Sequence, residues 1–98
     1  MVSRILVANV QIAVANTEYG WALPKGCKWF TLQCRTAVDV RIAFDSGHVA
    51  SSEPPYFSLK SGTSWSEDVD IKTPLKIFFA AASAVWIEAF VGIAEEEV

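Results

Sequence analysis

The residues that could do chemistry in this chain are few and lie far apart in the sequence. The single histidine, His48, follows Asp45 in the polar stretch DSGHVASSEPP, residues 45–55. A serine or cysteine nucleophile needs a base beside it, and one histidine offers at most one such pair. We interpret His48 and Asp45 as polar residues of a loop, and we expect neither catalytic residues nor enzymatic activity.

Metal and cofactor sites are not indicated either. Cys27 and Cys34 do not have the spacing of a zinc-binding pair, and one histidine cannot complete such a site. The acidic residues Glu67, Asp68 and Asp70 lack the glycine and the further oxygen ligands of a calcium loop, so we interpret them as turn-capping side chains. We therefore expect no metal and no cofactor.

The two cysteines also bear on where the chain is made. Cys27 and Cys34 lie at either end of what the pattern predicts to be one strand. Seven residues at about 3.3 Å each separate them by far more than the roughly 7 Å that a disulfide can span. We expect free thiols, which fits a protein made and assembled in a reducing cytoplasm.

Length and composition predict one domain, residues 1–98, with more apolar surface than it can bury. A chain of this size hides about two thirds of its unfolded surface. Its residues are 52% apolar and its net charge is -3, against about 45–50% apolar in ordinary domains. Because the basic residues are scattered, we expect no nucleic-acid partner. Some apolar surface is expected to need a protein partner.

Two apolar segments could imitate membrane or export signals. Residues 75–93 are long enough to span a bilayer, but Lys76 and Glu88 leave too short an uncharged stretch between them. Residues 4–15 have the layout of a signal peptide, but Asn9 and Gln11 interrupt the apolar run. We expect both segments to belong to the folded structure and no membrane partner.

Alternation of apolar and polar residues predicts about eight short strands. The expected strands are residues 5–15, 19–23, 29–35, 38–44, 56–60, 63–66, 75–79 and 84–93. A type I turn is expected at Leu23–Gly26, a hairpin connection at residues 36–37 and an extended loop at residues 45–55. Residues 80–83 are expected to form a loop or a helical turn. The fold class is therefore all-β, an antiparallel, jelly-roll-like β-sandwich, with an open barrel as the alternative.

The same alternation predicts which apolar side chains face outward. In the strand 29–35, Trp29 lies opposite the core side of Phe30 and Leu32. In the last strand, Trp86 and Phe90 share one face, and residues 85, 87, 89, 91 and 93 fill the other. A strand buried between two sheets explains this pattern, and so does a protein interface with aromatic anchors. A third reading is a sugar-stacking platform made by Trp29, Tyr56 or Trp65.

One part of the sequence resembles a known class of protein. The segments FTLQCR (30–35), VRIAF (40–44), PYFSLKSG (55–62) and WSED (65–68) follow each other in this order. This succession resembles small virion-associated proteins of tailed bacteriophages over residues 29–68. Residues 2–16 and 95–98 have no counterpart in that pattern.

The resemblance implies a structural protein rather than an enzyme. We expect a decoration or cement protein on the capsid surface of the virion, made in the host cytoplasm and bound to the major capsid protein. We also expect a homo-oligomer, with a trimer favoured over a dimer. The alternative is a carbohydrate-binding β-sandwich on a tail or fibre. The expected contact residues lie in the N-terminal strand, on the outward aromatic face, in the 45–55 loop and in the acidic tail 94–98: Ile5, Val7, Trp29, Trp86, Phe90, His48, Glu95 and Glu96.

Overall fold

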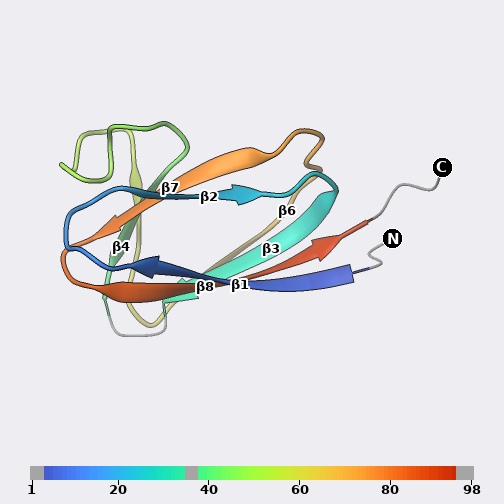
Figure 1. Ribbon diagram of the computed structural model, residues 1–98, viewed down its shortest axis with the longest axis horizontal. Helices are drawn as coiled ribbons and strands as arrows, with labels where there is room; N and C mark the ends of the chain where they lie inside the picture. The colour runs from blue at the N-terminus through green and yellow to red at the C-terminus, as the bar shows by residue number, and fades with distance from the viewer. Residues whose placement is uncertain (1–3, 35–37, 95–98) are drawn as a thin grey trace.

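The computed structural model describes residues 4–34 and 38–94 and contains eight β-strands in this part of the chain (Figure 1). The strands are β1 (Arg4–Ile12), β2 (Tyr19–Leu23), β3 (Cys27–Cys34), β4 (Val40–Ala43), β5 (Phe57–Leu59), β6 (Ser64–Asp68), β7 (Leu75–Ala81) and β8 (Val85–Ile93).

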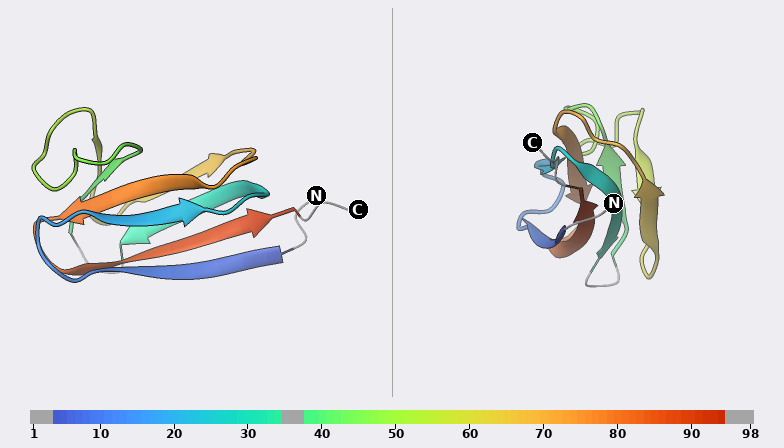
Figure 2. Two further views of the ribbon diagram at one scale, coloured as in Figure 1. Left: turned by 45° about the horizontal axis from the view of Figure 1, so that its top comes forward. Right: turned by 90° about the vertical axis from the view of Figure 1, so that its right-hand side faces the viewer.

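The strands form two four-stranded antiparallel sheets that pack as the two layers of a sandwich (Figure 2). One sheet has the order β1-β8-β3-β6, and the other has the order β2-β7-β4-β5. Strand pairs nest inside one another, because β4 pairs with β5, β3 with β6, β2 with β7 and β1 with β8. This arrangement confirms the all-β, jelly-roll-like sandwich that the alternation predicts.

The predicted hairpin between the third and fourth strands is wrong. Residues 35–37 lie outside the described residues, but the strands on either side of them belong to different sheets. The connection therefore crosses from one layer to the other. Its length suits a hairpin, but the pairing of β3 with β8 and of β4 with β7 decides the topology.

The core forms where the inward faces of the two sheets meet. Phe30 and Leu32 of β3 face Val40 and Ile42 of β4, and each is at most 2% exposed. Phe79 of β7 is the largest fully buried side chain. The period of two residues predicted these assignments, because successive side chains of a strand point to opposite faces.

The turn before β3 differs by one residue from the predicted one. The N–H of Cys27 donates to the carbonyl of Pro24 at 3.2 Å, so the turn spans residues 24–27. Gly26 then occupies its third position with φ 88°, which is the backbone conformation that a type II turn requires there. Glycine adopts this conformation without steric cost, and its place in the chain therefore decides the turn type.

Most strand ends differ from the prediction, and Glu67 and Asp68, predicted as turn-capping residues, lie in β6. The first strand ends at Ile12, and Val14 lies in the turn that follows, where its backbone N–H donates to the Tyr19 hydroxyl. Ala80 and Ala81 belong to β7 rather than to a loop, because they pair with Arg41 and Val40 of β4. In the described residues no helix is long and apolar enough to cross a membrane.

The long loop between β4 and β5, residues 44–56, is held against the outer side of the β2-β7-β4-β5 sheet. Val49 is fully buried there against Ala43 and Ala80. The Arg41 guanidinium donates to the carbonyl of Val49, and Glu18 accepts hydrogen bonds from the loop at 2.7 and 2.8 Å. The predicted loop exists and covers the part of this face around Ala43 and Ala80.

Candidate interaction surface

The outer side of the β1-β8-β3-β6 sheet has no such cover within the described residues. We call this side the outer face. The strand register places Val7 beside Phe90 and Phe90 beside Thr31, in one row across β1, β8 and β3. The neighbouring row contains Ile5, Gly92 and Trp29. Five residues predicted as contacts from the sequence lie on this face: Ile5, Val7, Trp29, Trp86 and Phe90.

Four of these side chains gather into an apolar patch, which we define as Ile5, Val7, Trp29 and Phe90. Val7 is 72% exposed, Ile5 57% and Phe90 47%. The rings of Trp29 and Phe90 meet edge to face, with centroids 5.4 Å apart. Such a group of exposed apolar residues is typical of an interaction surface, whereas single exposed residues are ordinary.

Trp86 lies further along β8, at the other side of a polar row. Glu88 stands between Trp86 and Phe90 on the same face and accepts a hydrogen bond from Gln33 at 3.1 Å. Gln11 is opposite Trp86. The outer face therefore has an apolar end and a polar middle, and the two aromatics predicted to act together are separated.

Gly92 is a member of the site that sequence analysis missed. A Cβ atom placed on Gly92 would come within 2.3 Å of Nε1 of Trp29, so the indole ring lies directly over this glycine. A glycine inside a strand often marks the close approach of another group. A glycine inside the predicted strand 84–93 therefore indicated that some group approaches the backbone there. Only the β3–β8 register identifies that group as Trp29.

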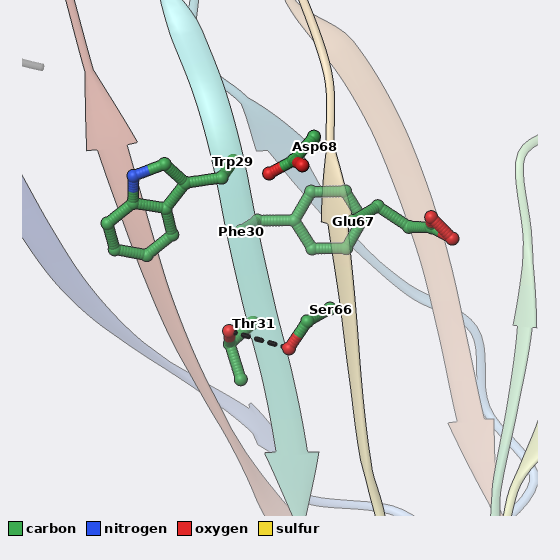
Figure 3. A pocket seen from close by; sticks show the side chains of 6 residues that line it. All are labelled: Trp29, Phe30, Thr31, Ser66, Glu67 and Asp68. Atoms are coloured by element: carbon green, nitrogen blue, oxygen red, sulfur yellow. Dashed lines mark hydrogen bonds between the residues drawn. The ribbon is translucent and has the colours of Figure 1, made fainter. Parts of the chain in front are cut away.

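The β3–β6 side of the outer face forms a polar groove (Figure 3). It has a volume of about 400 Å³ and is lined by residues 29–31 and 66–68. The hydroxyls of Thr31 and Ser66 are hydrogen bonded at 2.8 Å, and Asp68 pairs with Trp29 across the strands. Hydroxyls and a carboxylate therefore line one shallow groove beside Trp29, whose indole ring turns away from Asp68 towards β8 (Figure 3).

The other aromatics proposed as sugar platforms are occupied by packing. The Trp65 ring meets Phe30 and Phe57 edge to face, each with centroids 4.8 Å apart, and Phe44 at 6.1 Å. Tyr56 packs against the cluster of Val49. Of the three aromatics considered from the sequence, Trp29 alone lines the polar groove.

A second, apolar groove runs along the side of the sandwich between β1 and β2. Its volume is about 260 Å³. Leu6 and Val91 line it from one sheet, and Trp21 and Pro24 line it from the other. Leu6 is 37% exposed although it points inward, because it borders this groove. We call it the side groove.

The remaining predicted contact residues are not on the outer face. His48 lies in the 44–56 loop, where its Nδ1 is 3.0 Å from the carbonyl oxygen of Glu53. The Glu53 N–H donates to the His48 carbonyl at 2.8 Å, so the two residues close the loop. Glu95 and Glu96 lie outside the described residues.

In the described part of the chain, no cluster of three or more His, Cys, Asp or Glu residues could hold a metal ion. Cys27 and Cys34 are both free, as the strand geometry predicted. Burial raises the pKa of each thiol above its ordinary value, and for Cys34 the nearby Asp39 carboxylate raises it further. Both therefore stay protonated at neutral pH.

Comparison with known proteins bears on the fold. No protein-family model matches the sequence, and no curated protein matches it significantly. Among solved structures, the chain is similar to a de novo designed double-stranded β-helix determined by solution NMR, with a TM-score of 0.51 and 17% identity. The match covers 94% of this chain and all of the design. At this identity the likeness shows the fold alone, and it agrees with the nested strand order.

Proposed function

We propose that this protein is a structural component of a bacteriophage virion that binds the outer surface of the head. In this role it stabilises the shell by bridging neighbouring copies of the major capsid protein. The observation that carries the proposal is the apolar patch on one face of the sheet, in which Ile5, Val7 and Phe90 are exposed and Trp29 is half-buried. The resemblance over residues 29–68 supports the phage assignment.

In this proposal the protein stabilises the shell by mass action. A ligand that binds only the assembled shell lowers the free energy of that shell relative to separated subunits. Because many copies bind one lattice, modest contacts at each copy are sufficient. Aromatic residues on a flat sheet suit such contacts, since they bury a large apolar area with few rotatable bonds. The 44–56 loop with His48 and the acidic tail with Glu95 and Glu96 are further candidate contacts in this proposal.

A binding experiment with empty heads tests this proposal. We expect the purified protein to co-sediment in many copies with heads of the major capsid protein that lack it. We expect Phe90→Ser to weaken binding by at least about tenfold, because a half-exposed phenyl ring buried at an interface contributes about 1.5 kcal/mol or more.

Leu75→Ser is the matched control. Leu75 is 39% exposed, but it lies on β7 of the other sheet and outside every candidate contact. It should bind the heads as the wild type does. Heads without the protein should rupture at a lower temperature than decorated heads. Failure of the wild-type protein to bind assembled heads, or equal loss of binding in both variants, would contradict the proposal.

A carbohydrate-binding role on a tail or fibre is the second candidate. The polar groove favours it, because the Asp68 carboxylate and the Thr31 and Ser66 hydroxyls line it together with Trp29, whose indole ring turns towards Gly92. Sugars bind by stacking on an aromatic ring and by hydrogen bonding to such groups. Glycan binding that is lost in Asp68→Asn and Trp29→Ala, together with no binding to heads, would favour this role over shell stabilisation.

A further inference from the structure

We infer that the free edge of β1 pairs antiparallel with β1 of a second copy of this chain, forming a two-fold dimer with a continuous eight-stranded sheet. The inference rests on the edge of the sheet and not on the apolar patch as a shell-binding surface. It would hold whether the protein binds a capsid or a glycan.

Among the described residues, nothing protects the outer edge of β1. β1 is the end strand of its sheet and pairs with β8 over nine residues, Arg4–Ile12, without a bulge in that stretch. It contains no proline, and its only charged residue is Arg4 at one end. Soluble proteins usually shield such an edge by shortness, charge, proline or a bulge. A long, regular, apolar edge is therefore a site for another strand.

The other three edges of the sandwich are shielded in these ways. β5 is three residues long and follows Pro54 and Pro55. β6 is five residues long and ends in Glu67 and Asp68. β2 is also five residues long, and it begins at the turn that follows β1. Only β1 among the described edges combines length with an apolar sequence.

β1 also exposes apolar side chains on both of its faces. Val7 and Ile5 are exposed on the outer face, and Leu6 is exposed towards the side groove. A partner bound only to the outer face would leave Leu6 uncovered. A strand added at the edge lies beside all three, because cross-strand neighbours on both faces are about 5 Å away.

β1 is in addition complementary to a second copy of itself. Antiparallel edge pairing has its two-fold axis perpendicular to the sheet, so outward residues meet outward residues. The register that pairs all nine residues has Ala8 on the axis. It sets Leu6 opposite Val10, Val7 opposite Asn9 and Arg4 opposite Ile12 of the second copy. No two like charges face each other, and the edge of about 30 Å forms on the order of eight backbone hydrogen bonds.

The charge of the molecule is compatible with this arrangement. The acidic residues Glu67 and Asp68 lie on β6, at the opposite edge of the same sheet. Edge pairing therefore keeps them far from the two-fold axis. It also leaves the outer faces of both copies on the same side, so that two apolar patches adjoin at the axis. The edge serves the second copy, and the patch stays available to another partner.

The test uses a pair of oppositely charged variants. In the full-length register the two Val7 residues lie diagonally across the axis, about 7–8 Å apart. Val7→Glu and Val7→Lys each place like charges there and should weaken dimerisation by at least about tenfold, measured by sedimentation velocity over a concentration series. Mixing the two variants should restore dimers, which native mass spectrometry detects as the mixed species.

Val14→Glu is the matched control, because Val14 is 58% exposed but lies beyond the end of β1. It should dimerise as the wild type does. We expect the Val7 variants to fold, because Val7 is 72% exposed. Circular dichroism verifies this for each variant. Hydrogen exchange of the wild type should show β1 amides that become protected as concentration rises.

Several results would overturn the inference. They are a wild-type protein that stays monomeric at all concentrations, a trimer, dimers of Val7→Glu as stable as the wild type, and no mixed species from the two charge variants. All are measured on the purified chain without heads or glycans. A failure here is therefore distinct from a failure of the proposed shell binding.

Discussion

At the scale of single residues, the packing of Trp29 on Gly92 shapes the apolar patch. The indole ring lies where the side chain of residue 92 would be, and its edge-to-face contact with Phe90 follows from that position. Any side chain at position 92 would displace a rigid ring. The exposed surface therefore depends on a residue that itself offers no side chain to a partner.

Gly92→Ala should accordingly be destabilising. The added Cβ atom would be 2.3 Å from Nε1 of Trp29, and overpacking of this kind costs about 1–3 kcal/mol in the free energy of unfolding. Urea unfolding followed by tryptophan fluorescence measures this loss.

Gly20→Ala is the comparison. Its Cβ atom would also meet a close neighbour, at 2.6 Å, but that atom is Cε of the flexible Lys76 side chain. Because this side chain can move away, we expect a change below about 1 kcal/mol. Equal effects of the two substitutions would contradict the role assigned to the indole ring.

At the scale of elements, the two sheets differ in whether another part of the described chain covers their outer sides. The 44–56 loop covers part of one of them through the buried side chain of Val49. On the other sheet, the described chain leaves Val7 and Phe90 exposed. The loop is therefore a structural layer, and the uncovered sheet is the side available to a partner.

Val49→Ala tests how the loop is held. Removing two buried methyl groups should cost about 1–3 kcal/mol, and the loss should appear as local opening of residues 44–56. Limited proteolysis and hydrogen exchange would detect faster cleavage and exchange in this segment. The same substitution at the exposed Val14 should have no effect. Unchanged protection of the loop in Val49→Ala would show that Arg41 and Glu18 hold it without this anchor.

At the scale of the whole molecule, stability should be greatest between two pH limits. The Ser61 N–H lowers the pKa of Asp39, and hydrogen bonds from Lys28 and Lys72 lower that of Asp70, from an ordinary value of 3.8. Their contribution is present above that value and is lost as pH falls through the lower, folded-state pKa. Both carboxylates are exposed, so the acid effect should be small.

The two cysteine thiols should lower the stability of the fold at alkaline pH. Burial raises the pKa values of Cys27 and Cys34 above the ordinary 9.0. The unfolded chain then releases these protons at a lower pH than the folded chain, so stability should fall as pH rises above about 9. Urea unfolding between about pH 7 and pH 10 measures this decrease. A Cys27→Ala, Cys34→Ala double variant should show a smaller decrease; an identical one would contradict the assignment.

The sequence by itself determined the strands, their faces and the free thiols. Alternation with a period of two assigns Phe30 inward and Trp29 outward wherever the strand lies, because successive side chains must point to opposite sides. It likewise placed Phe90 outward, on the face where the structure finds it beside Trp29. These are local properties of the backbone, and they need no knowledge of neighbouring strands.

Only the tertiary structure decided which strands are neighbours. The short link between β3 and β4 suits a hairpin, but pairing with β7 and β8 places these strands in different sheets. The meeting of Trp29 with Gly92, the covering of one sheet by Val49 and the exposed edge of β1 all follow from that order. They depend on contacts between residues far apart in the chain, and no local pattern of side chains specifies such contacts.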